Sequence, residues 1–201
     1  NPCDYTDAPA RDTPKKKALR SDGMRDLVGM LDPADPCQMV VRAAVRSGMR
    51  RGELVGLDIG DLDFTRGVIH VRHGVDSDGN QKDPKTPDSV RDLPMTPALR
   101  SDFMARIAKI EEDFARTRQE TGSDCPTVGP DTPLVCNRLG ERYKPDAPTK
   151  WWRRNRSALG FDGWTIHEMR HSYLSEMARR KTNPKVLQEL AGHADYATTA
   201  N

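Results

Sequence analysis

The residues whose types and spacing could do chemistry are concentrated in one stretch, Trp164 to His193. Thr165 and Glu168 have the spacing of a capping box, which predicts that a helix begins here. His167 would lie in the first turn of that helix, and Arg170 three residues later on the same face. Free backbone N–H groups, the helix dipole and these two side chains would then converge. Such an arrangement favours the binding of an anion such as phosphate.

The same stretch allows a second interpretation, because it contains His-Glu-x-x-His, the zinc-protease signature. His167 and His171 would be the ligands, Glu168 the base, and His193 a third ligand. His193 follows Gly192, and a glycine allows the sharp turn that comes before a new helix. A solvated surface helix is the third interpretation, since motifs of this length also occur by chance.

Arg50 is a candidate in another part of the chain. It follows Ser47-Gly48, where glycine is expected to end a helix, so its side chain lies at a turn and can be aimed at a site. Glu53, three residues later, is placed to pair with Arg50 and hold the guanidinium in one orientation. The alternative is a surface ion pair that contributes little to stability.

Lysines and arginines at three further places could contact phosphate. Lys85 is expected at the bend before a strand, where it is either simply exposed or reaches a neighbouring site as a mobile acid. Two basic groups could instead be solvated surface or DNA contacts. They are Lys15, Lys16 and Lys17, and the cations Lys150, Arg153, Arg154 and Arg156 around Trp151 and Trp152.

Length and composition set limits on the class of protein. The 201 residues are enough for one domain with a full core, or one domain plus an arm. The net charge of +2 does not by itself argue for nucleic acid. Four scattered cysteines without metal-ligand spacing fit a reducing compartment. No membrane-length apolar run and no signal peptide are visible in the sequence, so the cytosol is the expected location.

The elements that must position the candidate side chains follow from apolar periodicity. Residues 1–20 lack such periodicity and are rich in Pro, Asp and Lys, which indicates a linker or arm with a further segment upstream. Ser21 is expected to cap a helix that ends before Asp32–Pro36. A second helix then runs to Ser47.

The middle of the chain predicts a small sheet followed by a long helix. Val68–Val71 and Ser89–Met95 are expected strands, with a turn at Asp78-Gly79. Thr96-Pro97 is a strong start for a helix that ends near Gly122. The apolar face of this helix is expected to carry Leu99, Phe103, Ile107, Ile110 and Phe114.

The last part of the chain predicts a short buried strand and four helices. The strand is Leu134-Val135-Cys136, and a basic helix is expected from about Asp146 to Ala158. The helix that carries His167 should run to about Arg180, and another from Asn183 to Leu190. A final helix is expected to begin at Asp195.

Four short motifs occur in one order along residues 21–201. They are Gly48-Met49-Arg50-x-x-Glu53-Leu54; Lys85-Thr86 with Ser89-x-Arg91-x-Leu93-Pro94; His167-x-x-Arg170-His171; and Leu190-x-Gly192-His193 with Thr198-Thr199. Each is weakly specific alone. Together they resemble the catalytic domain of the tyrosine recombinases, the family of phage and bacterial integrases. The resemblance implies an α+β, mainly α fold, a helical bundle with a small antiparallel sheet of about three strands.

The resemblance also implies a role for each matching residue. Arg50 and Arg170 would clamp the non-bridging oxygens of a scissile DNA phosphate, because a guanidinium donates two fixed hydrogen bonds and stays charged. Lys85 would protonate the leaving 5′ oxygen. His167 and His193 would assist proton transfer and hold the phosphoryl group.

Glu53 would orient and support that site. No metal or other cofactor is implied, since the cations are side chains. The implied partners are double-stranded DNA and other recombinase subunits, in a tetrameric synapse. The chain would serve DNA recombination or integration in a phage or another mobile element.

The nucleophile of the family is a tyrosine nine residues after the position of His193. That position is the residue after Asn201, so the 201 residues alone are expected not to cleave DNA. Tyr196 lies only three residues past His193, and Tyr173 lies within a predicted helix and is most simply core. The core-binding domain of the family, expected upstream of the linker, is also outside this sequence.

Other interpretations explain fewer of the motifs. The zinc interpretation leaves Arg50 and Lys85 without a role and places the cation Arg170 between the proposed ligands. A DNA-binding module without chemistry is a further alternative, against which the full set of candidate side chains argues. A type IB topoisomerase shares the implied chemistry, but the wording of the motifs is integrase-like.

Overall fold

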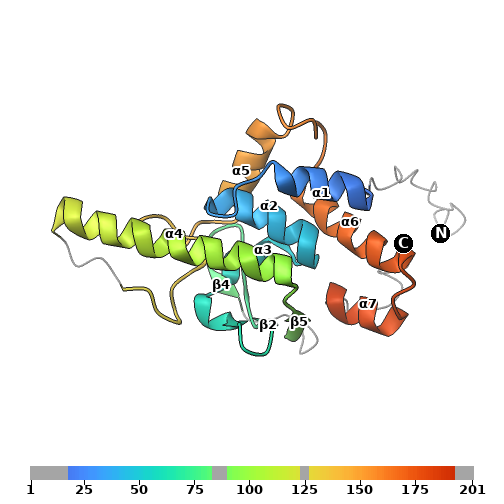
Figure 1. Cartoon of the computed structure of the whole chain (residues 1–201), viewed down its shortest axis with the longest axis horizontal. Helices are drawn as coiled ribbons and strands as arrows, with labels where there is room; N and C mark the ends of the chain where they lie inside the picture. The colour runs from blue at the N-terminus through green and yellow to red at the C-terminus, as the bar shows by residue number, and fades with distance from the viewer. Residues whose placement is uncertain (1–17, 83–89, 123–126, 193–201) are drawn as a thin grey trace, which may run out of the picture.

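Helix α2 (Pro36–Ser47) lies at the centre of the computed structural model, which describes residues 18–82, 90–122 and 127–192 (Figure 1). Most residues of α2 are buried because other helices surround it. These are α1 (Ser21–Gly29), α3 (Arg51–Gly56), α4 (Pro97–Thr121), α5 (Asp146–Asn155) and α6 (Ile166–Arg179). The expected mainly helical fold is confirmed.

The ends of α2 are fixed by local chemistry. The Asp35 side chain accepts hydrogen bonds from the N–H groups of Cys37 and Gln38, both at 2.9 Å. Gly48 ends the helix at a φ of 66°, in the left-handed region. A Cβ on Gly48 would lie 2.5 Å from Cδ1 of Tyr173, so glycine is required for space as well as for conformation.

Helix α1 begins differently from the prediction. Its N-cap is Arg20, without a side-chain cap, and Ser21 is the first helical residue. The Ser21 hydroxyl donates instead to Oε1 of Glu176 on α6, at 2.6 Å. Ser21 therefore joins two helices, and the capping prediction was wrong.

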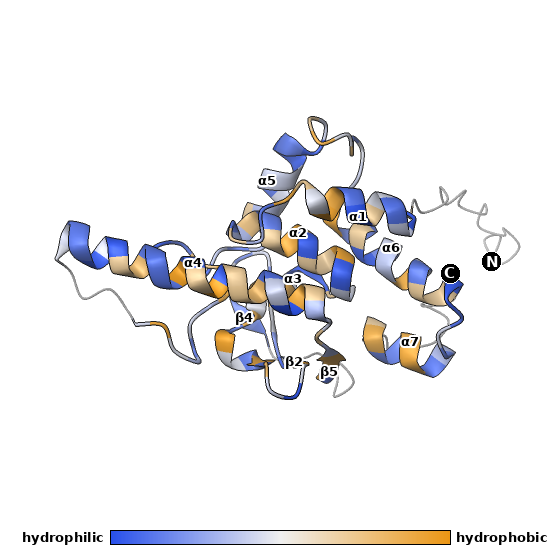
Figure 2. Ribbon diagram, in the orientation of Figure 1, coloured by the Kyte–Doolittle hydropathy of each residue, from blue (hydrophilic) through white to orange (hydrophobic). Residues whose placement is uncertain are grey.

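Helix α4 follows its prediction closely. Thr96 caps it by accepting a hydrogen bond from the N–H of Leu99, and Gly122 ends it at a φ of 61°. Its apolar and polar residues alternate at helical spacing, and its second half extends past the other elements (Figures 1 and 2). Four of the five expected core residues are buried, and Ile107 is partly buried against the core.

The sheet has the predicted size and orientation. Strands β1 (Leu62–Asp63), β2 (Val68–Val71) and β5 (Arg91–Pro94) form an antiparallel sheet in that order. Val71 pairs with Arg91, which places Arg91 at the start of β5. A separate hairpin joins β3 (Gly74–Val75) and β4 (Gln81–Lys82) across the predicted Asp78-Gly79 turn.

The segment Leu134–Cys136 is buried, as predicted, but it is not a strand of a sheet. Its backbone groups have other partners: the N–H of Leu134 donates to Leu57 O, and Arg106 donates to the carbonyls of Leu134 and Cys136. Cys136 also forms an isolated bridge with Arg142, and the N–H of Tyr143 donates to Val135 O, so an arginine side chain and single backbone bonds replace a paired strand here.

The C-terminal part follows the prediction with small shifts. Helix α5 ends at Asn155, three residues earlier than expected, and a short turn leads to Gly160. Helix α7 (Pro184–Ala191) is capped by Asn183 and ends at Gly192, which has a φ of 58°. The helix expected from Asp195 lies outside the described residues. Within the described part of the chain, each helix is too short or too polar to cross a lipid bilayer.

Candidate active site

The Glu53 carboxylate is the centre of the candidate site. Glu53 lies in α3 and is buried, with 8% of its surface exposed. Oε2 accepts a hydrogen bond from the backbone N–H of Arg50 at 2.7 Å, and Oε1 accepts one from Nη1 of Arg50 at 2.7 Å. The expected pairing of Arg50 with Glu53 is confirmed. It fixes both the start of α3 and the direction of the Arg50 guanidinium.

Arg91 is the second partner of Glu53, and it comes from the sheet. Its Nη1 donates to Oε1 at 3.0 Å and its Nη2 donates to Oε2 at 2.9 Å. The Arg91 side chain is only 7% exposed. This bidentate geometry is the strongest arrangement of an arginine–carboxylate pair. Each oxygen of Glu53 therefore accepts one bond from Arg91 and one from Arg50.

The end of α7 meets the same group of side chains. Nη2 of Arg50 donates to the carbonyl oxygen of Gly192 at 2.6 Å. A Cβ on Gly192 would lie 2.8 Å from Nη1 of Arg91 and 3.1 Å from Nη1 of Arg50. A glycine is therefore needed here for its positive φ and for the close approach of two guanidinium groups.

Arg170 completes the cluster from α6, where it is 4% exposed. Its Nη1 donates to the carbonyl of Gly48 and its Nη2 to the carbonyl of Ala191. These carbonyls end α2 and α7, where the helix dipoles favour a cation. Arg170 thus ties together the turns that precede Arg50 and that follow α7.

The charges in the cluster shift two pKa values. Burial would raise the pKa of Glu53, but the hydrogen bonds and charge of Arg91, followed by those of Arg50, outweigh it and hold this pKa below its usual range. Burial, followed by the nearby Arg50, lowers the pKa of Arg170 to about 10. At neutral pH both groups are charged, so the cluster contains three positive guanidiniums and one negative carboxylate.

A cavity of about 460 Å³ opens beside this cluster. Arg50 and Arg170 line it together with the exposed His167, so the three predicted side chains do come together. Arg51 reaches across its edge and donates to Thr149 of α5 at 2.6 Å. The remaining lining residues are Met49, Gly52, Thr165 and Ile166.

The start of α6 at this cavity is the predicted capping box. The N–H of Glu168 donates to Oγ1 of Thr165 at 3.2 Å. The Glu168 carboxylate accepts bonds from the N–H and the hydroxyl of Thr165, at 2.6 and 2.9 Å. The Glu168 carboxylate is therefore bound to Thr165 at the start of the helix. It is not placed to act as a base beside a zinc ion.

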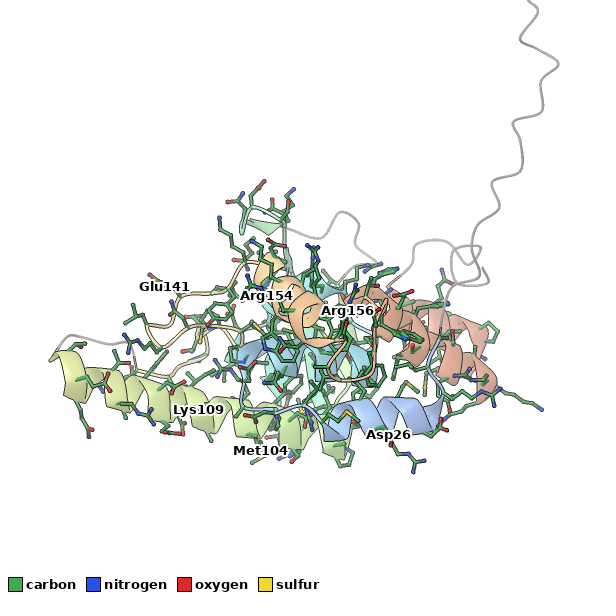
Figure 3. The ribbon with its side chains drawn as sticks, turned by 90° about the horizontal axis from the view of Figure 1, so that it is seen from above. Asp26, Met104, Lys109, Glu141, Arg154 and Arg156 are labelled. Carbon is green, nitrogen blue, oxygen red and sulfur yellow. The ribbon has the colours of Figure 1, made fainter. Side chains whose placement is uncertain are left out.

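Several predicted site residues lie outside the described residues: Lys85, His193, and the arm lysines Lys15, Lys16 and Lys17. The other basic group is on and just after α5. Lys150, Arg153 and Arg154 are exposed, and Figure 3 shows Arg154 on this helix. Lys150 also pairs with Asp146 at 2.7 Å, within the helix.

Arg156 differs from the exposed Arg153 and Arg154 because it is partly buried and binds the backbone of its own chain. Its Nη1 donates to the carbonyl of Trp164 at 2.8 Å, and the indole N–H of Trp152 donates to the same oxygen at 2.8 Å (Figure 3 labels Arg156). Trp152 is 2% exposed and belongs to the core. These bonds hold the turn that leads into Thr165 and the start of α6.

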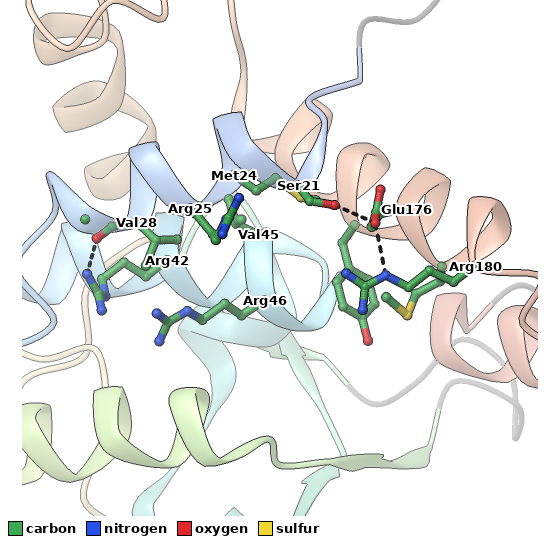
Figure 4. A pocket seen from close by; sticks show the side chains of 12 residues that line it. Ser21, Met24, Arg25, Val28, Arg42, Val45, Arg46, Glu176 and Arg180 are labelled. Atoms are coloured by element: carbon green, nitrogen blue, oxygen red, sulfur yellow. Dashed lines mark hydrogen bonds and ion pairs between the residues drawn. The ribbon is translucent and has the colours of Figure 1, made fainter.

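A second cavity, of about 810 Å³, lies between α1, α2 and α6 (Figure 4). Its wall includes Arg42 and Arg46 of α2, and these share the buried carboxylate of Asp102, each at 2.5 Å. On the α6 side, Glu176 binds Ser21 and Arg180 (Figure 4). The charged groups of this wall are thus engaged mainly with neighbouring elements.

One group of possible metal ligands occurs among the described residues. The ligand atoms of Asp58, Asp61 and His73 all lie within 4.8 Å of one another. The Asp58 carboxylate accepts a hydrogen bond from Arg142 at 2.6 Å, and that of Asp61 accepts one from the N–H of Asp58. These bonds give both carboxylates a structural role at the end of α3.

The sequence and the fold can be compared with those of known proteins. The family model described as "Phage integrase family" matches residues 17–201. The chain belongs to the phage integrase family. All four motifs lie within the matched residues.

Relatives of this integrase-family chain include named recombinases. It is 30% identical over 164 residues to tyrosine recombinase XerC of Azotobacter vinelandii, covering 81% of this chain and 46% of that protein. It is 27% identical over 173 residues to a XerC-like tyrosine recombinase of Caldanaerobacter subterraneus, covering 79% and 42%. The chain thus spans less than half the length of these relatives.

The fold is also that of a solved integrase. The Tn1549 transposon integrase, in complex with transposon right end DNA, superimposes with a TM-score of 0.75 at 24% identity. The match covers 100% of this chain and 66% of that one. XerA recombinase matches with a TM-score of 0.60 at 20% identity.

Arg91 is the residue of this cluster for which no role was predicted, although it stands within the second motif. Its signal was its position, two residues after Ser89 at the start of a predicted strand. Thirty-eight residues separate it from Glu53, and the two meet only in the folded structure, where Arg91 at the start of β5 donates to the Glu53 carboxylate of α3.

Proposed function

We propose that this domain binds a phosphodiester of DNA at the Glu53 cluster and promotes strand cleavage and rejoining through a phosphotyrosine intermediate. The observation that carries the proposal is the convergence of Arg50, Arg170 and His167 on one cavity, with two more positive charges than negative ones in the cluster behind it. Phosphoryl transfer requires such groups to be in place before the reaction, because charge develops on the equatorial oxygens.

Each side chain has a proposed part in this reaction. The guanidiniums of Arg50 and Arg170 bind the two non-bridging oxygens, and Glu53 keeps that of Arg50 in position. His167, exposed at the first turn of α6, donates to the same phosphoryl group. Lys85 protonates the leaving 5′ oxygen, and His193 assists proton transfer.

The nucleophile is proposed to be a tyrosine encoded directly after Asn201. Its hydroxyl gives its proton to His193 as its oxygen attacks phosphorus and forms a 3′-phosphotyrosine. The bond to the 5′ oxygen breaks, and that oxygen leaves as a hydroxyl with the proton from Lys85. Tyr173 does not suit this role, because it packs against Gly48 and burial raises the pKa of its hydroxyl. The 201-residue chain would therefore bind phosphate and form no covalent link.

Double-stranded DNA and further subunits of the same recombinase are the proposed partners. The exposed cations Lys150, Arg153 and Arg154 lie on α5, whose Thr149 lines the cavity, so they are placed to contact the flanking DNA backbone. A tetramer on paired DNA sites would allow strand exchange. The bacterial cytosol remains the proposed location.

A DNA-binding module without chemistry is the second candidate function. It shares the basic surface of α5 but gives no reason for the paired orientation of Arg50, or for the burial of Arg170 at 4% exposure beside the cavity. The zinc hydrolase alternative has weaker support still, because Glu168 is bound to Thr165.

The test is covalent trapping with a nicked suicide substrate, run on the 201-residue chain and on the full-length protein. Only the full-length protein should give a protease-sensitive shifted band, and changing its tyrosine after position 201 to phenylalanine should abolish that band. An adduct that maps to Tyr196 or Tyr173 would contradict the assignment of the nucleophile. Tight DNA binding with no adduct in the full-length protein would favour the module without chemistry.

A further inference from the structure

We infer that Arg91 is a positioning residue of this site, which acts by holding the Glu53 carboxylate and through it the phosphate-binding guanidinium of Arg50. The inference rests on the proposed function and deepens it. No role was assigned to Arg91 by its motif, and its side chain points away from solvent rather than into the cavity that Arg50 lines.

The geometry gives Arg91 more contact with Glu53 than Arg50 has through its side chain. Arg91 donates one hydrogen bond to each carboxylate oxygen, at 3.0 and 2.9 Å. The guanidinium of Arg50 donates only to Oε1, and its other bond goes to the carbonyl of Gly192. Arg91 thus fixes the plane of the carboxylate, and the plane decides where Oε1 meets Arg50.

The exposure of the two arginines separates their roles. The Arg50 side chain is 40% exposed and lines the cavity, whereas that of Arg91 is 7% exposed and does not. Arg91 also lies against the backbone of Gly192, where a methyl group would come within 2.8 Å of its Nη1. It therefore supports Arg50 from two sides: through Glu53, and through the turn whose carbonyl Arg50 binds.

Loss of Arg91 has a specific electrostatic consequence. Glu53 is buried, which raises its pKa, and the hydrogen bonds and charge of Arg91 are the largest of the causes that lower it, so loss of Arg91 would raise this pKa. Glu53 would then take up a proton at a higher pH than in the unmodified protein. A protonated Glu53 binds Arg50 less firmly, so the site would loosen as the pH falls.

The other charged groups near α3 do not replace Arg91. Arg170 of α6 is held by the carbonyls of Gly48 and Ala191. His73, next to β3, has its Nε2 2.7 Å from the carbonyl of Gly56, at the far end of α3. On α2, the guanidiniums of Arg42 and Arg46 bind Asp102.

The test is an Arg91→Met substitution in the full-length protein, because Met keeps an apolar stem of similar length. Single-turnover cleavage of a nicked suicide substrate, at saturating protein, should slow by about a hundredfold while DNA affinity stays unchanged. The loss of cleavage rate should grow as the pH falls from about 8 to about 5, because the pKa of Glu53 in this variant should lie above the usual value for glutamate, near 4.3. The unmodified protein should lack this acid limb.

Two further variants separate positioning from general stability. Adding Glu53→Gln to Arg91→Met should leave a slow rate without the acid limb, because the titrating group is gone. Arg46→Met, which removes an arginine from the buried carboxylate of Asp102, should keep the pH profile of the unmodified protein. An Arg91→Met profile like that of Arg46→Met, or a fall in DNA affinity as large as the fall in rate, would overturn the inference.

A measurement without DNA keeps the inference separate from the proposed function. In the unmodified protein the lowered pKa of Glu53 stabilises the fold above the unfolded-state pKa, and this contribution is lost as the pH falls through the folded-state pKa. In Arg91→Met the raised pKa should destabilise the fold at neutral pH, and acid should relieve this. The stability gap between the two proteins should therefore narrow between about pH 8 and pH 5. A gap that does not change with pH overturns the inference, whether or not the protein cleaves DNA.

Discussion

Two clusters of arginines around one buried carboxylate occur in this domain, and they differ in what their charges face. In the Asp102 cluster, Arg42 and Arg46 take one carboxylate oxygen each. In the Glu53 cluster, Arg50 and Arg91 share both oxygens, and the buried Arg170 lies beside them, where burial and then the charge of Arg50 lower its pKa. One positive charge is left over in the first cluster and two in the second.

The other hydrogen bonds of these arginines show what the difference in surplus charge means. Arg42 donates to the carbonyls of Val28 and Leu31 at the end of α1, and Arg46 donates to Ala98 of α4. These bonds join three helices, so the Asp102 cluster holds the fold together even though Arg42 and Arg46 also border the second cavity. Arg50, by contrast, is 40% exposed in a cavity that it shares with the exposed His167. Surplus charge directed at a cavity is typical of a binding site.

The largest effect is expected from Asp102→Ala. This change leaves Arg42, which is 8% exposed, without its counter-charge, and removal of one partner of a buried pair costs about 3 to 5 kcal/mol. Urea unfolding should show this loss, while cleavage per folded molecule of the full-length protein stays unchanged. Equal loss of cleavage and stability would remove the distinction between the two clusters.

Arg50→Lys and Arg170→Lys should each slow DNA cleavage by about a hundredfold to a thousandfold, because a lysine cannot reproduce the two fixed bonds of a guanidinium. Arg46→Lys is the matched control in the Asp102 cluster and should leave the rate unchanged. Single-turnover kinetics of the full-length protein measure this. Cleavage at the normal rate by either lysine variant would mean that the guanidinium does not bind the phosphate.

Gly192→Ala should have a smaller effect on stability and a selective effect on activity. The left-handed backbone costs alanine about 1 kcal/mol, and the new methyl group would push Arg91 and Arg50 away from Glu53. Gly122→Ala is the control, since Gly122 has a φ of 61° and no atom within 4 Å of its Cβ position. Gly192→Ala should lose more stability than Gly122→Ala in thermal unfolding, because it also disturbs the pairs of Glu53, and only Gly192→Ala should lose cleavage. Full activity of Gly192→Ala would show that the close approach has no role.

The smallest effect concerns the basic surface of α5. Alanine at Lys150, Arg153 or Arg154 should reduce the dependence of log affinity on log salt by about 0.9 for each DNA phosphate that the removed cation had neutralised. Arg116→Ala, on the exposed face of α4, should not change this slope. Fluorescence anisotropy with duplex DNA at several salt concentrations measures it. Slopes equal to that of Arg116→Ala would place the DNA on another surface.

Local sequence signals predicted the helices well because helix ends depend on neighbouring residues. Thr96 with Gly122, and Thr165 with Glu168, mark the ends that the structure has. The prediction of a strand at Leu134–Cys136 was wrong, since the carbonyls of Leu134 and Cys136 bind a side chain, Arg106, from a distant helix. No local pattern indicates such a long-range hydrogen bond.

The candidate site shows the same division. Arg50 and Glu53 are three residues apart, so their pairing could be predicted from one turn of helix. Arg91 joins Glu53 across 38 residues, and this contact depends on how the sheet packs beside α3. The sequence motif named Arg91 without a role, and the tertiary structure supplies the partner.

The most direct test of the account is a structure of the full-length protein on a nicked DNA duplex with orthovanadate, which mimics the phosphoryl group in its transition state. The account predicts that oxygens of the vanadate lie within hydrogen-bond distance of the guanidiniums of Arg50 and Arg170, with Glu53 still bound to Arg50 and Arg91. Vanadate held between Arg42 and Arg46, or vanadate bound at the nick but away from Arg50 and Arg170, would contradict this site.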